Sequence, residues 1–456
     1  MRVIICGAGR VGYGIAARLA HEQNTVTVVD VSADLVRKVT TELDVRGVIG
    51  HGAYPDILKQ AGIESADMLI AVTYSDEVNM MACQIAHSLF NVPTKVARVR
   101  AQSYLKSQWN DLYSRENMPI DIIISPEVEI GKSILRLINM PGAFDVVPFA
   151  DNAVKLLGIK INEDCPIVAT PINQIPDLFP ELRAEVVGIR REEQLFVPTD
   201  EDPLYVGDDA FFIVKSEHAS RLMEIVGSRG DRARHIVIIG GGNVGNYVAQ
   251  ELEGISGIRC RVIELDKSRA EESAESLRRT VVLNGDAMSA EVQQEAGVSD
   301  AELVLCVTND DKTNILAGVL AKKLGALQTV CLVNDVSMQA LLSELPIDKY
   351  IDPRAATVSS ILRHVRRGRI LDVYPLGNGA GEVIEGEVLD TSFLAGKKLE
   401  DIHTDGIAIG AVIQDGAMMR KEDNLIFKKG DRLVLMAEPS AVRQVEEFFR
   451  VSSDFF

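Results

Sequence analysis

The sequence contains few aromatic residues and no long apolar run. Aromatic side chains make up 5% of its 456 residues, and there is one tryptophan. No apolar stretch approaches the ~18 to 20 residues that a membrane-spanning helix requires, and the first residues lead into a strand and a glycine loop rather than a signal peptide. The composition, 46% hydrophobic and 25% charged, is typical of a globular protein. We therefore expect a soluble cytoplasmic chain of about two to four domains.

Basic residues and cysteines are also scarce. Lysine and arginine number 48 against 66 acidic residues, which gives a formal net charge of −18. Because nucleic-acid binding needs a basic face that neutralises phosphates, this balance argues against a nucleic-acid partner. It also argues against unaided adhesion to an anionic membrane. The six cysteines are scattered through apolar segments without a C-x-x-C pair, so we predict reduced core thiols and neither a zinc site nor a disulfide framework.

The chain repeats itself. The segment G-A-G-R-V-G at residues 7–12 follows an apolar run, and G-G-G-N-V-G at residues 240–245 does the same about 230 positions later. A-V-T-Y-S-D at residues 71–76 is matched by C-V-T-N-D-D at residues 306–311. Further matches follow in the same order along both copies. The repeat indicates one ancestral module of about half the chain, duplicated with small insertions and deletions.

Within each copy the apolar pattern changes partway. The strand-like segments of the first part are residues 3–6, 25–29 and 68–72, and again 236–239, 261–263 and 303–307. Continuous apolar strands that alternate with helical stretches indicate a parallel sheet covered on both faces. A helical stretch follows, and then short alternating strands with Pro, Gly and Asp turns. We predict an α/β protein with two tandem Rossmann-like doubly wound parallel-sheet domains, each followed by a small α+β domain.

The repeat also gives domain boundaries, with the hydrophilic segment 228–234 as the linker between the two halves. The predicted parts are a first Rossmann nucleotide-binding domain at 1–125, a connecting helix at 126–143, a small α+β domain at 144–227, a second Rossmann nucleotide-binding domain at 234–352, a connecting helix at 353–369 and a second small α+β domain at 370–456.

The glycine loops carry the chemistry. In the G-x-G-x-x-G pattern of residues 7–12, the first glycine allows the turn, the second admits a pyrophosphate and the third lets the helix pack on the strand. Asp30 ends the next strand, where a carboxylate would hold a ribose hydroxyl. Residues 240–245 with Glu264 repeat this arrangement. We expect a nucleotide site in each copy; the alternative is a degenerate Rossmann fold that keeps its glycines for packing.

The residues leave the identity of the nucleotide open. A carboxylate at the position of Asp30 or Glu264 repels a 2′-phosphate, which favours NAD(H) over NADP(H). ATP and ADP offer the same free ribose hydroxyls and phosphates, and they stay as alternatives.

Other polar residues follow the predicted strands. His51, and Asp286 in the second copy, come after the third strand and either contact adenosine or lie in solvent. Thr73-Tyr74 and Thr308-Asn309 end the fourth strand, at the edge where ligands of open α/β sheets bind.

Arginines distinguish the two copies. Arg98 and Arg100 are suited to phosphates, whereas the second copy has Leu332 and Asn334 at these positions, so the two sites should hold anionic charge unequally. A separate basic cluster at residues 363–369 is either a solvated helix end or a contact for an acidic partner.

No catalytic constellation or metal-ligand spacing stands out, which leaves two function classes. An NAD-dependent oxidoreductase with a duplicated Rossmann domain would need a proton donor on a substrate domain, and the parts after each Rossmann copy are small. A regulatory subunit needs only nucleotide states that bias a geometry read by a partner. We favour the regulatory subunit and expect no enzymatic activity.

Two further segments, D-M-L-I-A-V-T at 67–73 and N-M-M-A-C-Q at 79–84, carry a family resemblance together with the doubled glycine loops. They resemble the TrkA family of peripheral subunits of bacterial Trk potassium uptake, over essentially the full length. The resemblance implies tandem regulator-of-potassium-conductance (RCK) domains, RCK N and RCK C in each copy, in a homotetrameric ring. It further implies gating of a TrkH-type membrane potassium channel from its cytoplasmic face by NAD(H), or by ATP and ADP, with the membrane reached through that partner.

The motif and the resemblance together nominate nucleotide contacts in both copies. They are Gly7, Ala8, Gly9, Arg10, Val11, Gly12, Asp30, His51, Thr73, Tyr74 and Arg98, and then Gly240, Gly241, Gly242, Asn243, Val244, Gly245, Glu264, Asp286, Thr308 and Asn309. Two positions depart from the family pattern: His51, where such domains often have Asn or Asp, and Leu332 in place of an arginine.

Overall fold

The computed structural model covers the whole chain in two compact units. It describes residues 1–21, 24–105, 107–114, 116–192, 194–227, 233–335, 337–338, 342, 344–354, 357–358, 360–361, 370–376, 380–402, 405–419 and 425–450. The first unit comprises residues 1–131 and 235–362, and the second comprises residues 132–234 and 363–456. Each unit therefore combines corresponding parts of the two repeats.

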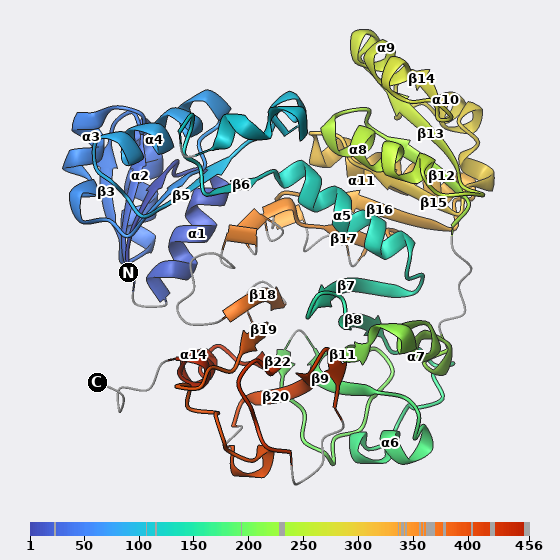
Figure 1. Cartoon of the computed structure of the whole chain (residues 1–456). Helices are drawn as coiled ribbons and strands as arrows, with labels where there is room; N and C mark the ends of the chain where they lie inside the picture. The colour runs from blue at the N-terminus through green and yellow to red at the C-terminus, as the bar shows by residue number, and fades with distance from the viewer. Residues whose placement is uncertain are drawn as a thin grey trace. The chain divides into compact units, whose positions relative to one another are not determined.

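The first unit begins with a parallel sheet. Its elements are β1 (Arg2–Cys6), α1 (Arg10–His21), β2 (Thr25–Asp30), α2 (Ala33–Glu42), β3 (Arg46–Ile49), α3 (Pro55–Gln60), β4 (Met68–Ala71), α4 (Asp76–Ser88), β5 (Thr94–Arg98), β6 (Ile122–Ile124) and the start of α5 (Pro126–Ile138). The strand order is β3-β2-β1-β4-β5-β6, and every pair is parallel. This is the order of a doubly wound nucleotide-binding fold, with its switch point between β1 and β4. Figure 1 draws this first Rossmann-like domain in blue.

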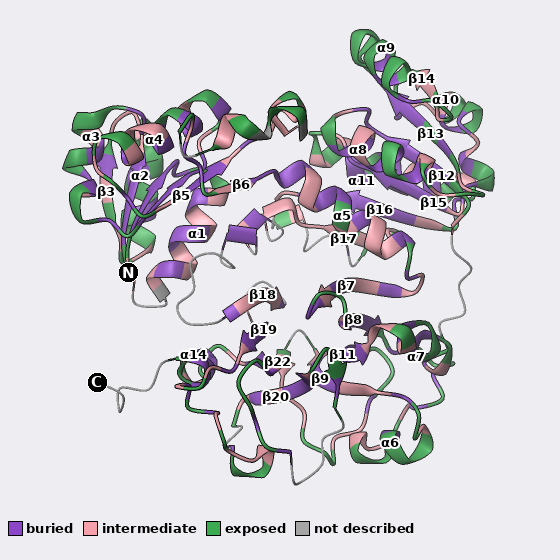
Figure 2. Ribbon diagram, in the orientation of Figure 1, coloured by how far each residue is buried: buried purple, intermediate pink, exposed green. Residues whose placement is uncertain are grey.

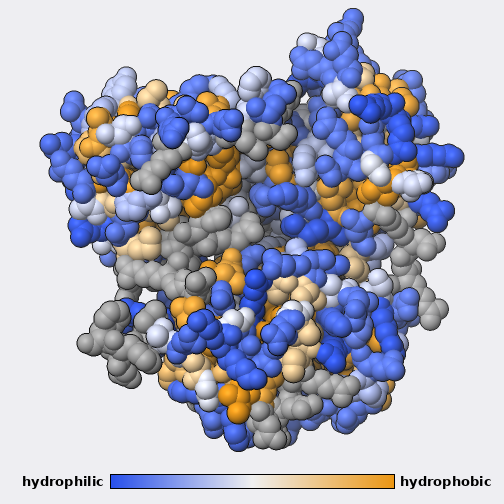
Figure 3. All heavy atoms as spheres, viewed as in Figure 1, coloured by the Kyte–Doolittle hydropathy of each residue, from blue (hydrophilic) through white to orange (hydrophobic). Residues whose placement is uncertain are grey.

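The second repeat builds the same sheet. Its elements are β12 (His235–Ile239), α8 (Asn243–Glu253), β13 (Arg259–Glu264), α9 (Lys267–Ser276), β14 (Val281–Asn284), α10 (Ala290–Glu295), β15 (Leu303–Cys306), α11 (Asp311–Leu324), β16 (Gln328–Leu332) and β17 (Lys349–Ile351). The order is β14-β13-β12-β15-β16-β17, again parallel. Figure 3 shows hydrophilic side chains over α9, whose residues are mostly exposed.

Local sequence explains these elements. All four residues of β4 and of β15 are buried, because parallel strands carry helices on both faces (Figure 2). The helices that follow them begin at side-chain caps: Ser75 accepts a hydrogen bond from the Val78 amide before α4, and Asp310 accepts one from the Thr313 amide before α11.

The second unit contains two antiparallel sheets. The first has strands β7 (Ala143–Phe149), β8 (Val154–Lys160), β9 (Ala184–Arg191), β10 (Gln194–Phe196) and β11 (Asp209–Lys215), with helices α6 (Ile175–Leu178) and α7 (Ala219–Ile225). The second has strands β18 (Ile370–Leu376), β19 (Gly381–Glu387), β20 (Ile407–Gln414), β21 (Ala417–Met418) and β22 (Arg432–Ala437), with helix α14 (Val442–Phe449). Their orders are β10-β9-β11-β8-β7 and β18-β19-β22-β20-β21.

The two antiparallel sheets share one hydrophobic core. Buried side chains of the first sheet, among them Phe149 and Ile213, pack with buried side chains of the second, among them Val383 and Met436. Polar contacts cross the same interface: the Ala150 amide donates to Glu385 Oε2 at 2.8 Å, and the Tyr374 hydroxyl donates to Asp145 Oδ1 at 3.0 Å. Because the core belongs to both sheets, neither small domain would keep its buried surface without the other.

The predicted fold class is confirmed: two Rossmann-like parallel sheets, each followed along the chain by an antiparallel α+β domain. Within the part of the chain that the structure describes, no helix is long and apolar enough to cross a membrane. No group of His, Cys, Asp and Glu among these residues is arranged to hold a metal ion. All six cysteines are buried with free thiols, and burial raises the pKa of Cys6 to about 12.

Candidate nucleotide-binding sites

The first glycine loop lies at the switch point, between the ends of β1 and β4. Gly7 has φ +112°, and a Cβ there would lie 2.9 Å from the Val72 carbonyl oxygen. A Cβ on Gly12 would lie 1.8 Å from the Gly7 carbonyl oxygen. A Cβ on Gly9 would meet no atom within 4 Å, and Gly9 lines a pocket. Packing therefore requires Gly7 and Gly12, whereas Gly9 leaves open the space that a phosphate would enter.

In both copies, the acidic residue at the end of the second strand accepts a hydrogen bond from a backbone amide of the glycine loop. Asp30 accepts hydrogen bonds from the Ala8 amide at 2.7 Å and the Ser32 amide at 2.8 Å. Glu264 accepts them from the Gly241 amide at 2.7 Å and the Asp266 amide at 2.9 Å. A Cβ on Gly241 would lie 3.1 Å from Glu264 Cβ. The second copy thus pairs a longer acid, Glu264, with a smaller loop residue, Gly241, where the first copy pairs Asp30 with Ala8.

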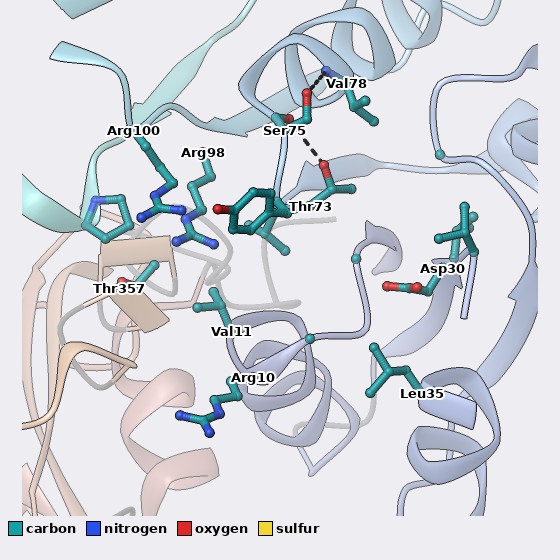
Figure 4. Close-up of a pocket in the computed structure, with 18 of the residues that line it drawn as sticks. Arg10, Val11, Asp30, Leu35, Thr73, Ser75, Val78, Arg98, Arg100 and Thr357 are labelled. Atoms are coloured by element: carbon teal, nitrogen blue, oxygen red, sulfur yellow. Dashed lines mark hydrogen bonds between the residues drawn. The ribbon is translucent and has the colours of Figure 1, made fainter. Parts of the chain in front are cut away.

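A pocket of about 610 Å³ lies over the first glycine loop, within the size range of ligand sites (Figure 4). The predicted residues that line it are Gly7, Gly9, Arg10, Val11, Asp30, His51, Thr73, Tyr74 and Arg98. Ala8 and Gly12 are buried beneath it. In Figure 4, Asp30 lies at one end of the pocket and Arg98 and Arg100 lie toward the other. A nucleotide with its ribose at Asp30 would therefore extend its phosphates past the loop toward arginines.

The two arginines at this end differ in their pairing. Arg98 Nε is buried and has no hydrogen-bond partner, and burial together with the neighbouring charge of Arg100 lowers the pKa of Arg98. Burial alone would also lower the pKa of Arg100, but the hydrogen bond and charge of Glu127 raise it overall. The Arg100 guanidinium stands 5.5 Å from the centre of the exposed Tyr74 ring. Arg98 lines the pocket, so its positive charge would attract an anion there.

Two residues that were not predicted from the sequence hold the ends of β4 and β5 in place. Asn79 accepts from the amide and hydroxyl of Thr73 at 2.8 and 2.7 Å, and donates to the carbonyl oxygen of Arg98 at 2.9 Å. Asp76 accepts from the Arg100 amide at 3.0 and 2.9 Å. The position of Thr73 is therefore fixed by its hydrogen bonds to Asn79. The available signal was the D-x-x-N pattern of residues 76–79, which recurs at 311–314.

The residue after the third strand closes a turn in both copies. His51 Nδ1 accepts from the Ala53 amide at 3.3 Å, and its ring stacks on Tyr54 with centroids 4.5 Å apart. Asp286 Oδ1 accepts from the Met288 amide at 2.8 Å in the same way. His51 lines the pocket, whereas Asp286 is exposed to solvent.

The second glycine loop has the same backbone with different polar groups around it. Gly240 has φ +108°, and a Cβ on Gly245 would lie 1.9 Å from the Gly240 carbonyl oxygen. Val244 is buried, while Gly242 and Asn243 reach the surface. Asn314 binds the amide and hydroxyl of Thr308 at 2.9 and 2.7 Å, as Asn79 does for Thr73. Asn309 is exposed beside Thr308, at the place of Tyr74.

Models of two domain families match the chain twice each. The TrkA-N domain matches residues 3–126 and 236–353, and the TrkA-C domain matches residues 156–227 and 383–450. The chain belongs to the TrkA family. It is 49% identical over 458 residues to the Trk system potassium uptake protein TrkA of Azorhizobium caulinodans, and 38% identical over 461 residues to that of Halomonas elongata. Both alignments cover 100% of each chain.

Solved structures share the fold of this TrkA-family chain. The crystal structure of the GsuK RCK domain superposes with a TM-score of 0.60 at 18% identity, covering 98% of this chain and 95% of that one. A structure described as the GsuK channel bound to NAD gives a TM-score of 0.60 at 16% identity, covering 98% of this chain and 78% of that one. At these identities the likeness concerns the fold, and it agrees with the predicted RCK N and RCK C order.

The pocket extends beyond the first TrkA-N match. Besides residues of the first copy it is lined by Asn334, Pro353, Arg354 and Thr357, which belong to the second copy. That the two copies meet at one pocket could not be predicted from the sequence, because contacts between distant segments leave no local pattern. The basic cluster of residues 363–369 lies outside the described residues.

Proposed function

We propose that this chain is a nucleotide-sensing regulatory subunit that gates a membrane potassium channel of the Trk uptake system. It binds NAD(H), or ATP and ADP, at two Rossmann sites per chain. The observation that carries the proposal is the pocket at the first glycine loop, with Asp30 at one end and arginines at the other, in a chain that is a TrkA-family member over its full length.

The names of similar proteins support the potassium role. Full-length relatives are called Trk system potassium uptake proteins, and a channel of the same RCK fold is described as bound to NAD.

In each copy, a carboxylate at the second strand favours a free ribose, as in NAD(H) or ATP, over a 2′-phosphate.

A regulatory role also agrees with the way in which corresponding domains of the two copies are paired. The Rossmann sheets of both copies belong to one unit, and the small domains of both copies share one core in the other unit. A nucleotide that binds one arrangement of the Rossmann sheets more tightly than another would shift their populations, typically by ~1 to 3 kcal/mol of coupling. We propose that four chains form a ring on the cytoplasmic face of a TrkH-type channel, which brings this acidic chain to the membrane.

Titration of ATP, ADP, NAD and NADH into the purified full-length protein tests the nucleotide part of the proposal. We expect two nucleotides per chain. NADPH, titrated alongside these four, should bind more weakly than NADH because Asp30 and Glu264 repel its 2′-phosphate. Absence of binding by all four nucleotides would contradict the proposal.

A second experiment separates the regulatory subunit from an oxidoreductase. The protein is mixed with NADH and a panel of carbonyl substrates, and absorbance of NADH is followed over time. We expect no turnover; steady oxidation of NADH would favour the enzyme instead.

A further inference from the structure

The two Rossmann copies meet through two reciprocal helix contacts in the first unit. The helix that starts at each glycine loop, α1 or α8, contacts the helix that follows the last strand of the other copy. In one contact, a Cβ on Gly14 of α1 would lie 3.1 Å from Cγ2 of Val358. In the other, a Cβ on Gly131 of α5 would lie 2.2 Å from Cδ1 of Tyr247 of α8. Each contact therefore packs a glycine of the first copy against a larger side chain of the second.

These four residues occupy equivalent places in the repeat. Gly14 and Tyr247 are each the seventh residue after the first glycine of their loop. Gly131 and Val358 are each the fifth residue after the proline at the start of their helix. Two identical copies would make two identical contacts, as in a symmetric dimer. Instead, the first copy has glycine at both places, and the second copy has tyrosine and valine.

This difference decides which copies can pair through these helices. If two first copies from different chains met in this way, Gly14 would face Gly131, and each contact would contain a gap. If two second copies met, Tyr247 would face Val358. Tyr247 already lies where a single added carbon on Gly131 would overlap with it, so a valine there would overlap more. Of these pairings, a first copy with a second copy fills the space without overlap.

The small domains differ in the same manner at an independent position. Strands β9 and β20 each have a bulge where the pairing with β11 or β22 skips one residue, Val187 in β9 and Gly410 in β20. The two bulge residues are therefore equivalent. A Cβ on Gly410 would lie 2.8 Å from Cγ1 of Val187 and 2.2 Å from Cδ1 of Ile213. Here the first copy has the larger residue and the second copy has glycine.

The two bulges face each other in the shared core, so a like pair would bring equivalent residues together. Two first copies would place Val187 against Val187 and Ile213, where glycine leaves too little room even for a Cβ. Two second copies would place Gly410 against Gly410 and leave a gap. A pair of first copies thus combines gaps between the Rossmann domains with overlap between the small domains, and a pair of second copies combines the reverse.

We propose that Gly131 with Tyr247, and Val187 with Gly410, are specificity residues that restrict this face of each module to the unlike copy. The partner that the face fits is the other half of a chain of this kind, and a second example of the same half is rejected. Separate chains can then join through this face only as unlike pairs, or must join through other surfaces. This specificity is independent of the proposed nucleotide function.

The test uses full-length Gly131→Val, Tyr247→Gly and the double variant that combines them. Gly131→Val overlaps with Tyr247 within the chain, but it gives the first copy both members of a glycine–valine contact like that of Gly14 with Val358. The double variant restores a glycine–valine contact within the chain. The control, Gln250→Val, adds the same side chain at an exposed site of α8. Thermal unfolding, and molecular mass by light scattering over a range of concentrations, are measured on all of them.

We expect Gly131→Val to lower the unfolding midpoint by about 5 °C or more, because the added side chain overlaps with Tyr247. It should also form larger species that grow with concentration and reverse on dilution, because first copies of different chains can now pair. The double variant should return to the wild-type mass and unfold at a higher temperature than either single variant, because the contact within the chain is refilled. Gln250→Val should match wild type.

Two results would overturn the proposal. One is a Gly131→Val protein that unfolds and assembles like wild type. The other is a Gly131→Val protein that unfolds earlier but forms no larger species at any concentration, since the two residues would then serve packing alone. Should Gly131→Val not fold or aggregate irreversibly, Tyr247→Gly carries the same test: it opens a gap instead of an overlap, and it gives second copies a glycine to face Val358.

Discussion

Glu127 Oε1 accepts a 2.9 Å hydrogen bond from Nε of Arg100, and the other oxygen of this buried carboxylate has no hydrogen-bond partner. Arg100 also lines the first-copy pocket. The carboxylate and a phosphate bound in the pocket would therefore compete for the same guanidinium.

Replacing Glu127 by Gln is expected to strengthen ATP binding at the first site. The amide keeps a hydrogen-bond acceptor for Arg100 but removes the competing charge, so we expect the ATP dissociation constant to fall about threefold to tenfold. Calorimetry at low and moderate salt measures it, with Glu64→Gln, an exposed carboxylate paired with Lys59, as the control. An ATP affinity that is unchanged or weaker would show that Glu127 does not oppose the ligand.

Asp30→Ala should weaken one nucleotide site and leave the other intact. The carboxylate lines the pocket where we propose that the ribose binds, and it accepts a hydrogen bond from the Ala8 amide of the glycine loop. We expect a loss of about tenfold or more at the first site. The matching variant Glu264→Ala should act on the second site alone. An unchanged calorimetric affinity at the first site would remove Asp30 from the binding residues.

Two glycine substitutions should separate folding from binding. Gly12→Ala places a Cβ 1.8 Å from the Gly7 carbonyl oxygen, so we expect severe destabilisation, above about 3 kcal/mol. Gly9→Ala meets no atom and should fold normally, but its methyl group faces the pocket and should weaken nucleotide binding. Thermal denaturation and calorimetry on both variants test this. Normal nucleotide affinity in Gly9→Ala would place the phosphates elsewhere.

The interface between the small domains should depend on pH through Asp145. Burial raises the pKa of Asp145 to about 6, against the hydrogen bond from Tyr374 and the charge of Arg136, which lower it. Because the folded state binds this proton more tightly than the unfolded state, stability contributed here falls as pH rises from about 4 to 6.

Asp145→Asn removes that ionisation and keeps an oxygen for the Tyr374 hydroxyl. We expect a gain in unfolding free energy of roughly 1 to 3 kcal/mol at pH 8 that disappears near pH 4. Denaturant unfolding at both pH values measures it. An equal effect of the substitution at pH 4 and pH 8 would show that Asp145 does not titrate in this range.

Much of the fold follows from local sequence. The doubled glycine loops, the apolar strands and the acidic residue after the second strand each obey short-range rules, and the structure places them as predicted at β1, β2 and β4. Asp30 and Gly9 line the pocket because these local patterns place them at the end of β2 and in the glycine loop.

The remaining features depend on contacts between distant segments. In the sequence, Asn79 looks like any other residue of a helix. Only the structure shows that its side-chain amide hydrogen-bonds both to Thr73 and to Arg98 at the end of β5. Arg354 belongs to the second copy by sequence and to the first pocket by position. The shared core of the small domains, with Tyr374 on Asp145, likewise joins residues more than half the chain apart, and no periodicity reveals such a pairing.

We propose that nucleotide binding to this chain controls a potassium channel. The most direct measurement is potassium flux through a purified TrkH-type channel in liposomes, with this protein added and ATP or NADH present or absent. We expect that flux depends on the protein and changes with the nucleotide, and that Asp30→Ala reduces the nucleotide effect. Flux that is the same with and without nucleotide, while binding is shown in the same preparation, would contradict it.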